Sequence, residues 1–180
     1  MSSGVDGRAD VSALRAMAHP VRLQIMSLLT GTAMSAAEVA RELGLTHANA
    51  SYHLRHLVDT GHLVPAGEES VRGGRAKRYR YDLERPPEKA ADATTAGVFY
   101  RAVAAEMVRR AGLRRDVGGT GTSSDAELWV PPEVWQRVVR QVEEASDEIH
   151  RAALPMRTPG TVHVSVTTAL FEMDPPEDRS

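Results

Sequence analysis

Two groups of side chains in the first half of the chain offer the chemistry by which proteins contact nucleic acids. The first group supplies hydrogen-bond donors and acceptors: His47, Asn49, Ser51, Tyr52 and Arg55. Such side chains can read base edges, because an amide suits adenine and a guanidinium suits guanine or phosphate. The second group is cationic and follows further along the chain: Arg72, Arg75, Lys77 and Arg78. These cations suit phosphate contacts or the minor groove, and phosphate contacts make binding depend on salt.

The first group lies on the second of two helices that the sequence predicts. Ser35 begins a capping-box sequence, Ser-Ala-Ala-Glu, at the start of a helix that ends at Gly44. Thr46 then caps a helix over residues 47–60, and the polar group lies off its apolar stripe. That stripe consists of Ala50, Leu54, Leu57 and Val58. Two helices joined by a short turn that contains glycine predict a helix-turn-helix.

The second group lies on a predicted β-hairpin that directly follows these helices. The pattern favours a strand over 62–65, a polar turn over 67–74 and a returning strand over 76–83. A basic hairpin in this position is typical of a wing. The winged helix-turn-helix is predicted to span residues 11–85, after a flexible tail at 1–10. Arg80 lies further into the strand and could instead pair with an acid of its own domain.

Four stretches of this unit resemble ArsR-type winged helix-turn-helix repressors. They are ALRAMAHPVRLQIMSLL (13–29), AEVARELG (37–44), ASYHLRHL (50–57) and GHLV (61–64). The string SYHLR resembles a branch of that family that is common in actinobacteria, here with a C-terminal extension. The resemblance implies a homodimeric transcriptional regulator, a repressor, that binds a partly palindromic site on double-stranded DNA. It also implies that a ligand modulates the affinity, without naming that ligand.

The chain of 180 residues is long enough for a second region after the wing. Residues 88–174 are predicted to form a dimerisation and possible effector domain, followed by a tail at 175–180. The predicted elements are helices over 89–115 and 132–154 and strands over 127–130 and 161–173, the last three forming a β-α-β unit. The expected fold class is therefore mainly α with small β (α+β).

Aromatic side chains of the second region admit two interpretations. They could line an apolar pocket for a small-molecule effector, or they could form ordinary core, which is the interpretation that the pattern favours. The residues concerned are Phe99, Trp129, Trp135 and Phe171.

A metal sensor is one alternative that the sequence leaves open. The chain has no cysteine, which excludes thiolate ligands. His150 and Asp147 are one turn apart on the last predicted helix, with Glu143 one turn earlier, and could be part of a ligand set. A solvated charged face explains these residues more simply, so no metal and no cofactor are expected.

Other function classes find less support. No phosphate-binding loop, nucleophile elbow or zinc-protease motif is present, so an enzyme is not expected. The net charge of −2 opposes nucleic-acid binding only on average, because residues 71–80 carry cations and no acid. A winged helix that docks on a partner protein remains a second alternative. With no signal peptide and no apolar run long enough for a membrane, the chain is expected in the cytoplasm.

Overall fold

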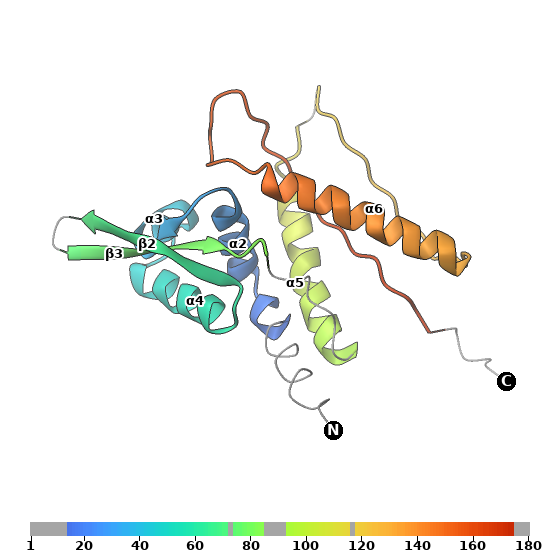
Figure 1. Ribbon diagram of the computed structural model, residues 1–180, viewed down its shortest axis with the longest axis horizontal. Coiled ribbons are helices and arrows are strands. Elements are labelled where there is room, and N and C mark those ends of the chain that lie inside the picture. The colour runs from blue at the N-terminus through green and yellow to red at the C-terminus, as the bar shows by residue number, and fades with distance from the viewer. Residues whose placement is uncertain (1–13, 72–73, 85–92, 116–117, 175–180) are drawn as a thin grey trace.

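The computed structural model describes residues 14–71, 74–84, 93–115 and 118–174. Its elements are α2 (Pro20–Gly31), β1 (Met34–Ser35), α3 (Ala36–Leu43), α4 (His47–Asp59), β2 (Leu63–Val71), β3 (Gly74–Tyr81), α5 (Ala93–Ala111) and α6 (Pro132–Arg151). Most of these are helices, and the strands form one small sheet, which confirms the predicted fold class. The hairpin and α6 lie at opposite ends of the molecule (Figure 1). The predicted tails at 1–10 and 175–180 lie outside the described residues.

Local signals in the sequence set the ends of the first helices. The His19 side chain accepts a hydrogen bond from the backbone N–H of Val21 and so caps α2. Ser35 and Glu38 form the predicted capping box at the start of α3. Gly44 then ends α3 with a φ of 65°, a left-handed conformation that glycine adopts without a steric penalty. The start and the end that the sequence predicts for α3 are therefore confirmed.

The hairpin is longer than the sequence predicts. β2 continues to Val71, well beyond the expected short strand, and pairs antiparallel with β3. A register shift between Pro65 and Glu68 absorbs Gly67, whose φ of 97° favours glycine. The expected polar turn at 67–74 is therefore wrong, because the bulge lets the strand resume after the glycine. β1, which the sequence does not predict, pairs with the other edge of β3.

The hydrophobic core lies between the first helices and the sheet. Its buried members are Ile25, Met26, Leu29, Met34, Val39, Ala40, Ala50, Leu54, Leu57 and Leu63. Three of the four residues of the predicted α4 stripe belong to this core, and Val58 packs against it. Packing on one face of α4 therefore fixes which face is left open to solvent.

The region after the hairpin has a different character. α5 packs against α2, where the Gln24 side chain donates to buried Glu106 at 2.5 Å. The predicted strands at 127–130 and 161–173 are wrong, since both segments are extended but belong to no sheet. A strand requires a hydrogen-bonded neighbour, and neither segment has one among the described residues. The predicted β-α-β unit thus reduces to the helix α6.

Three contacts attach this region to the first helices. Gly31, at the end of α2, lies so close to the Leu154 backbone that an added Cβ would be 2.3 Å from the Leu154 carbonyl oxygen. The Arg157 side chain pairs with Glu42 of α3 at 3.2 Å. Arg151 pairs with Glu84, just after the hairpin, also at 3.2 Å. The segment after α6 is therefore anchored beside the helix-turn-helix.

Candidate nucleic-acid interface

The open face of α4 carries the first group of polar side chains. Helical periodicity places Ser51, Tyr52 and Arg55 near the middle of this face, with Asn49 and His47 on opposite flanks. All five are exposed or half-exposed, whereas the other face of the helix is packed into the core. Arg55 donates from Nε to the Ser51 carbonyl oxygen at 3.3 Å. The only acid on the helix, Asp59, is its last residue.

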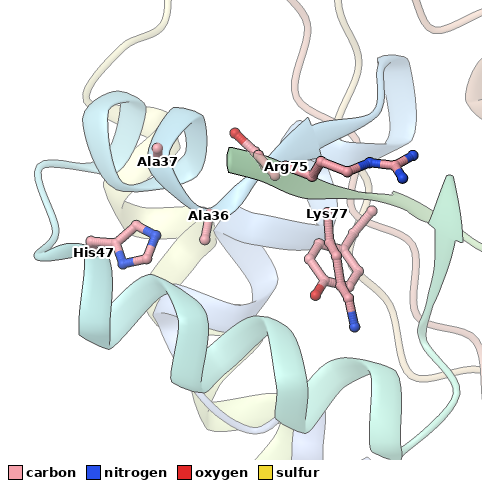
Figure 2. A pocket seen from close by; sticks show the side chains of 8 residues that line it. Ala36, Ala37, His47, Arg75 and Lys77 are labelled. Atoms are coloured by element: carbon pink, nitrogen blue, oxygen red, sulfur yellow. The ribbon is translucent and has the colours of Figure 1, made fainter. Parts of the chain in front are cut away.

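An open pocket of about 360 Å³ lies between the start of α4 and the hairpin. Its lining comes from β1, α3, α4 and β3 and consists of Ser35, Ala36, Ala37, His47, Arg75, Ala76, Lys77 and Tyr79. Figure 2 shows His47 at one end of this space, Lys77 running from β3 toward α4, and the Arg75 guanidinium pointing away from His47. Cationic wing side chains and the first turns of both helices thus border one hollow.

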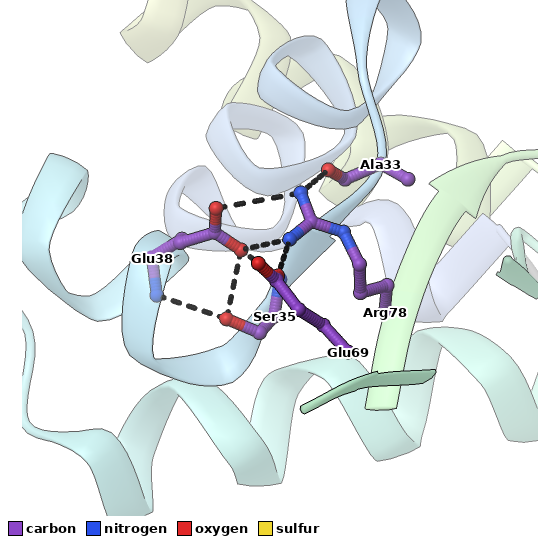
Figure 3. Close-up of polar contacts among 5 residues, drawn as sticks. All are labelled: Ala33, Ser35, Glu38, Glu69 and Arg78. Atoms are coloured by element: carbon purple, nitrogen blue, oxygen red, sulfur yellow. Dashed lines mark hydrogen bonds and ion pairs between the residues drawn. The ribbon is translucent and has the colours of Figure 1, made fainter. Parts of the chain in front are cut away.

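Arg78 has a different environment from the other wing cations. Its guanidinium contacts the Ala33 carbonyl oxygen and the carboxylates of Glu38 and Glu69 (Figure 3). Only 24% of the side chain is exposed. The guanidinium therefore joins three elements of the fold rather than facing solvent. Among the described residues, Arg78 rather than Arg80 pairs with acids of its own domain.

The electrostatics of Glu38 follow from this contact. Burial alone raises the pKa of the Glu38 carboxyl. Hydrogen bonds from the Ser35 backbone and hydroxyl, together with the charge of Arg78, outweigh the effect of burial and hold that pKa below its usual value. Glu38 is therefore ionised at neutral pH, and its charge is balanced by Arg78 at the start of α3.

The remaining wing cations are more open. Arg75 pairs with Glu68 across the hairpin at 2.8 Å, but 75% of its side chain is exposed. An exposed pair of this kind contributes little to stability, so its partner can be exchanged for another anion. Lys77 is exposed and makes no ion pair with any described residue. Arg72 lies outside the described residues.

Two histidines pack behind the open face of α4. The rings of His19 and buried His53 are 5.0 Å apart, and Tyr52 lies edge-on to His53. Burial lowers the pKa of His53, and the neighbouring charges of His19, Arg22 and His56 lower it further. Burial, followed by the charge of Arg22, also lowers the pKa of His19. The neutral form of both rings is therefore favoured in the fold.

The structure adds residues to this surface that the sequence analysis did not identify. Ala48 is exposed in the first turn of α4, near the middle of its open face, where a small side chain permits close approach. Ala36 and Ala37, in the first turn of α3, line the pocket opposite the wing. The capping box revealed where α3 begins, but only the pairing of β1 with β3 brings that turn beside the hairpin.

The other candidate sites are less well defined. Within the described residues, no three His, Asp or Glu side chains gather closely enough to hold a metal ion. The His150 Nδ1 lies 2.6 Å from the Ser146 carbonyl oxygen of its own helix. Trp129 and Phe171 are mostly exposed, so neither contributes to a closed core, and Phe171 contacts only the Tyr100 ring among aromatic neighbours described. No described helix has the length and apolarity that crossing a membrane requires.

Comparison with known protein families identifies the first part of the chain. Residues 17–64 match a family described as a helix-turn-helix domain. The match begins just before α2 and ends where β2 begins, so it contains both helices α3 and α4. No curated protein matches the chain. The first part of the chain therefore contains a helix-turn-helix domain, followed by a hairpin and further helices.

Proposed function

We propose that this protein is a transcriptional regulator that binds double-stranded DNA in a sequence-specific manner, as a homodimer, in the cytoplasm. One observation carries the proposal most strongly: α4, whose open face is free of acid until Asp59, begins at His47 beside the hollow that Lys77 and Arg75 also line. A recognition helix places its first turns against base edges while flanking elements contact the backbone. The arrangement suits a regulator rather than an enzyme.

The proposal assigns different roles to the two groups of side chains. Asn49, Ser51, Tyr52 and Arg55 face the major groove, and His47 lies where α4 meets the wing. Lys77 and Arg75 contact phosphates, as does Arg72 by its place in the sequence. Arg78 instead holds the wing against α3, because its contacts with Glu38 and Glu69 already occupy it.

Three acidic residues near this surface have their charge balanced by arginines that are not assigned to contact DNA. Glu38 and Glu69 pair with Arg78, and Glu42 on α3 pairs with Arg157. Glu68 pairs with Arg75 and would lose this partner when Arg75 contacts a phosphate. The resemblance to ArsR-type proteins supports repression as the outcome of binding and a ligand as its regulator, and membership of that family stays a prediction.

Fluorescence anisotropy tests the proposal directly. A labelled duplex from the region upstream of the protein's own gene is titrated against a scrambled duplex at two salt concentrations. We expect tighter binding to the first duplex and a steep loss of affinity with salt. Lys77→Gln should weaken both duplexes alike and reduce the salt slope by about one, whereas Asn49→Ala should cost about 1–3 kcal/mol at one or two base pairs.

A matched control removes the same charge elsewhere. Arg140 is exposed on α6, far along the chain from the hairpin. Arg140→Gln should therefore leave the affinity for both duplexes unchanged. Absence of binding to either duplex at low salt would contradict the proposal and favour a winged helix that docks on a protein. Equal effects of Lys77→Gln and Arg140→Gln would show that the wing does not contact DNA.

A further inference from the structure

Residues 161–174, after α6, form an open segment that belongs to no helix or sheet (Figure 1). Every residue from 161 to 174 is exposed, although valine, leucine and phenylalanine are usually buried. Val162, Val164 and Val166 alternate with the polar residues His163, Ser165 and Thr167. This period of two places the valines on one face, as in a strand that is covered on one side.

The backbone of this segment is equally without partners. Residues 162–173 make no backbone hydrogen bond to any described residue. An extended backbone with free N–H and C=O groups is a template for pairing with another strand. Both the side chains and the backbone therefore have the properties of a strand whose neighbour is missing from the single chain.

The neighbouring helix α6 also has an apolar face that the single chain leaves uncovered. α6 has an apolar stripe that includes Val134, Val138 and Val142, but none of its residues is buried. Most of the large apolar side chains that are exposed among the described residues also lie in this part of the chain, including Trp129, Leu154 and Phe171. Exposed apolar side chains gathered in one region indicate a surface that another protein chain covers.

We propose that residues 161–173 pair, as an antiparallel β-strand, with the same segment of a second copy of this chain and so form the homodimer interface. This inference deepens the homodimer part of the proposed function and does not depend on DNA binding. A two-fold axis brings identical segments together in opposite directions, which is the geometry of an antiparallel ladder. With the axis at Val166, Val162 of one copy lies opposite Leu170 of the other and Val164 lies opposite Thr168, so the valines of both copies share one face.

The contacts that anchor this segment link the dimer interface to the helix-turn-helix and so to the open face of α4. Leu154 packs against the end of α2, and Arg157 pairs with Glu42 of α3, only a few residues before the strand begins. A dimer formed through residues 161–173 therefore holds the two α4 helices at a defined separation. For a helix-turn-helix dimer, that separation sets the spacing of the half-sites on DNA.

Sedimentation velocity of the full chain tests the interface. We expect the unmodified protein to be a dimer at micromolar concentration. Val164→Asp combined with Val166→Asp should weaken the dimer by about 100-fold or more, because it brings like charges together on the buried face. Ser165→Asp combined with Thr167→Lys places opposite charges across from each other on the other face of the strand and should leave a dimer. All four positions are exposed in the single chain, and circular dichroism checks that each variant is folded.

A cysteine scan tests the register, since the chain has no cysteine of its own. Single cysteines at Val162, Val164, Val166, Thr168 and Leu170 can form a disulfide only between copies. Moving one residue from the axis adds about 6–7 Å between equivalent Cα atoms, so cross-linking should be strong at Val166→Cys and weak two residues away. Equal cross-linking at all five positions would overturn the antiparallel pairing.

The outcomes separate this inference from the proposed function. A dimer that survives both aspartates overturns the strand interface but leaves a homodimer through another surface. An unmodified protein that is a monomer overturns both the strand interface and the homodimer. In either case, binding of the same protein to a single half-site duplex is measured independently, so DNA recognition can stand or fail by itself.

Discussion

The first helices and the hairpin, residues 14–84, bury their apolar side chains, whereas the C-terminal region, residues 93–174, leaves its own exposed. Ten apolar residues of the first part form one buried cluster. Among the described residues of the C-terminal region, only Thr95, Ala102 and Glu106 are buried, and all three lie on α5. Both regions are rich in valine and leucine. The difference therefore lies in what each region packs against, and it indicates that one folds on its own core while the other requires a neighbour.

α5 joins the two regions through a buried charge. Burial alone raises the pKa of Glu106, but hydrogen bonds from Arg109 and Gln24 and the charges of Arg109 and Arg110 lower it overall. A buried carboxylate is tolerated only when its charge is compensated in this way. The contact between Gln24 and Glu106 therefore fixes α5 on α2 through a buried charge that its neighbours compensate.

The largest contrast is expected between a core residue and an exposed one. Leu54→Ala removes a fully buried side chain from α4 and should destabilise the protein by about 2–5 kcal/mol. Val108→Ala on α5, where most of the side chain is exposed, should change the stability by no more than about 0.5 kcal/mol. Urea titration followed by circular dichroism measures both changes. A large cost at Val108 would show that this face of α5 is also covered in solution.

A second contrast separates two cations of the same strand. Arg78→Gln leaves Glu38 and Glu69 without their shared partner and should cost about 1–3 kcal/mol of stability, because hydrogen bonds to charged groups are lost. Arg75→Gln removes an exposed pair and should cost less than about 0.5 kcal/mol, but it should weaken DNA binding at low salt. Urea titration and fluorescence anisotropy of both variants give the two readouts. Equal stability of the two variants would mean that Arg78 does not hold the wing.

The difference between contacts within one turn and contacts between distant segments explains which features could be predicted from the sequence. Ser35, Thr46 and Gly44 act on residues within one turn, so they locate α3 and α4 without knowledge of the rest of the fold. The open face of α4 also follows from its own periodicity. The role of Arg78 could not be predicted, because its partners at 33, 38 and 69 meet only when β1 and β2 flank β3.

The prediction of strands in the C-terminal region is wrong because a strand depends on a neighbour that the local sequence does not identify. The alternation over residues 161–167 indicates which side chains share a face, but it does not say whether their partner belongs to the same chain. The continuation of β2 beyond the bulge at Gly67 likewise depends on its pairing with β3 and not on the residues near Gly67 alone. The sequence pattern thus predicts local conformation, whereas the pairing of one strand with another becomes known only from the structure.

The smallest predicted effect concerns the histidines behind α4. Because burial lowers the pKa values of His19 and His53 in the fold, the unfolded chain binds more protons near its ordinary histidine pKa of about 6.5. The stability that these rings contribute is therefore fully present above about pH 6.5 and falls as the pH drops toward their lowered pKa values. Urea titrations between pH 7.5 and 5 should show this decline.

A pair of variants assigns the decline to this cluster rather than to the protein as a whole. His53→Gln removes a buried ring whose Nδ1 has no hydrogen-bond partner among the described residues, and it should flatten the pH dependence. His163→Gln removes an exposed ring of the C-terminal segment and should leave the pH dependence unchanged. The groups that lower the pKa of His53 come from α2 and α4 and include no acid, so protonation there gains no compensating pair. If the free energy of unfolding of His53→Gln depends on pH as strongly as that of the unmodified protein, the pH sensitivity comes from groups other than this ring.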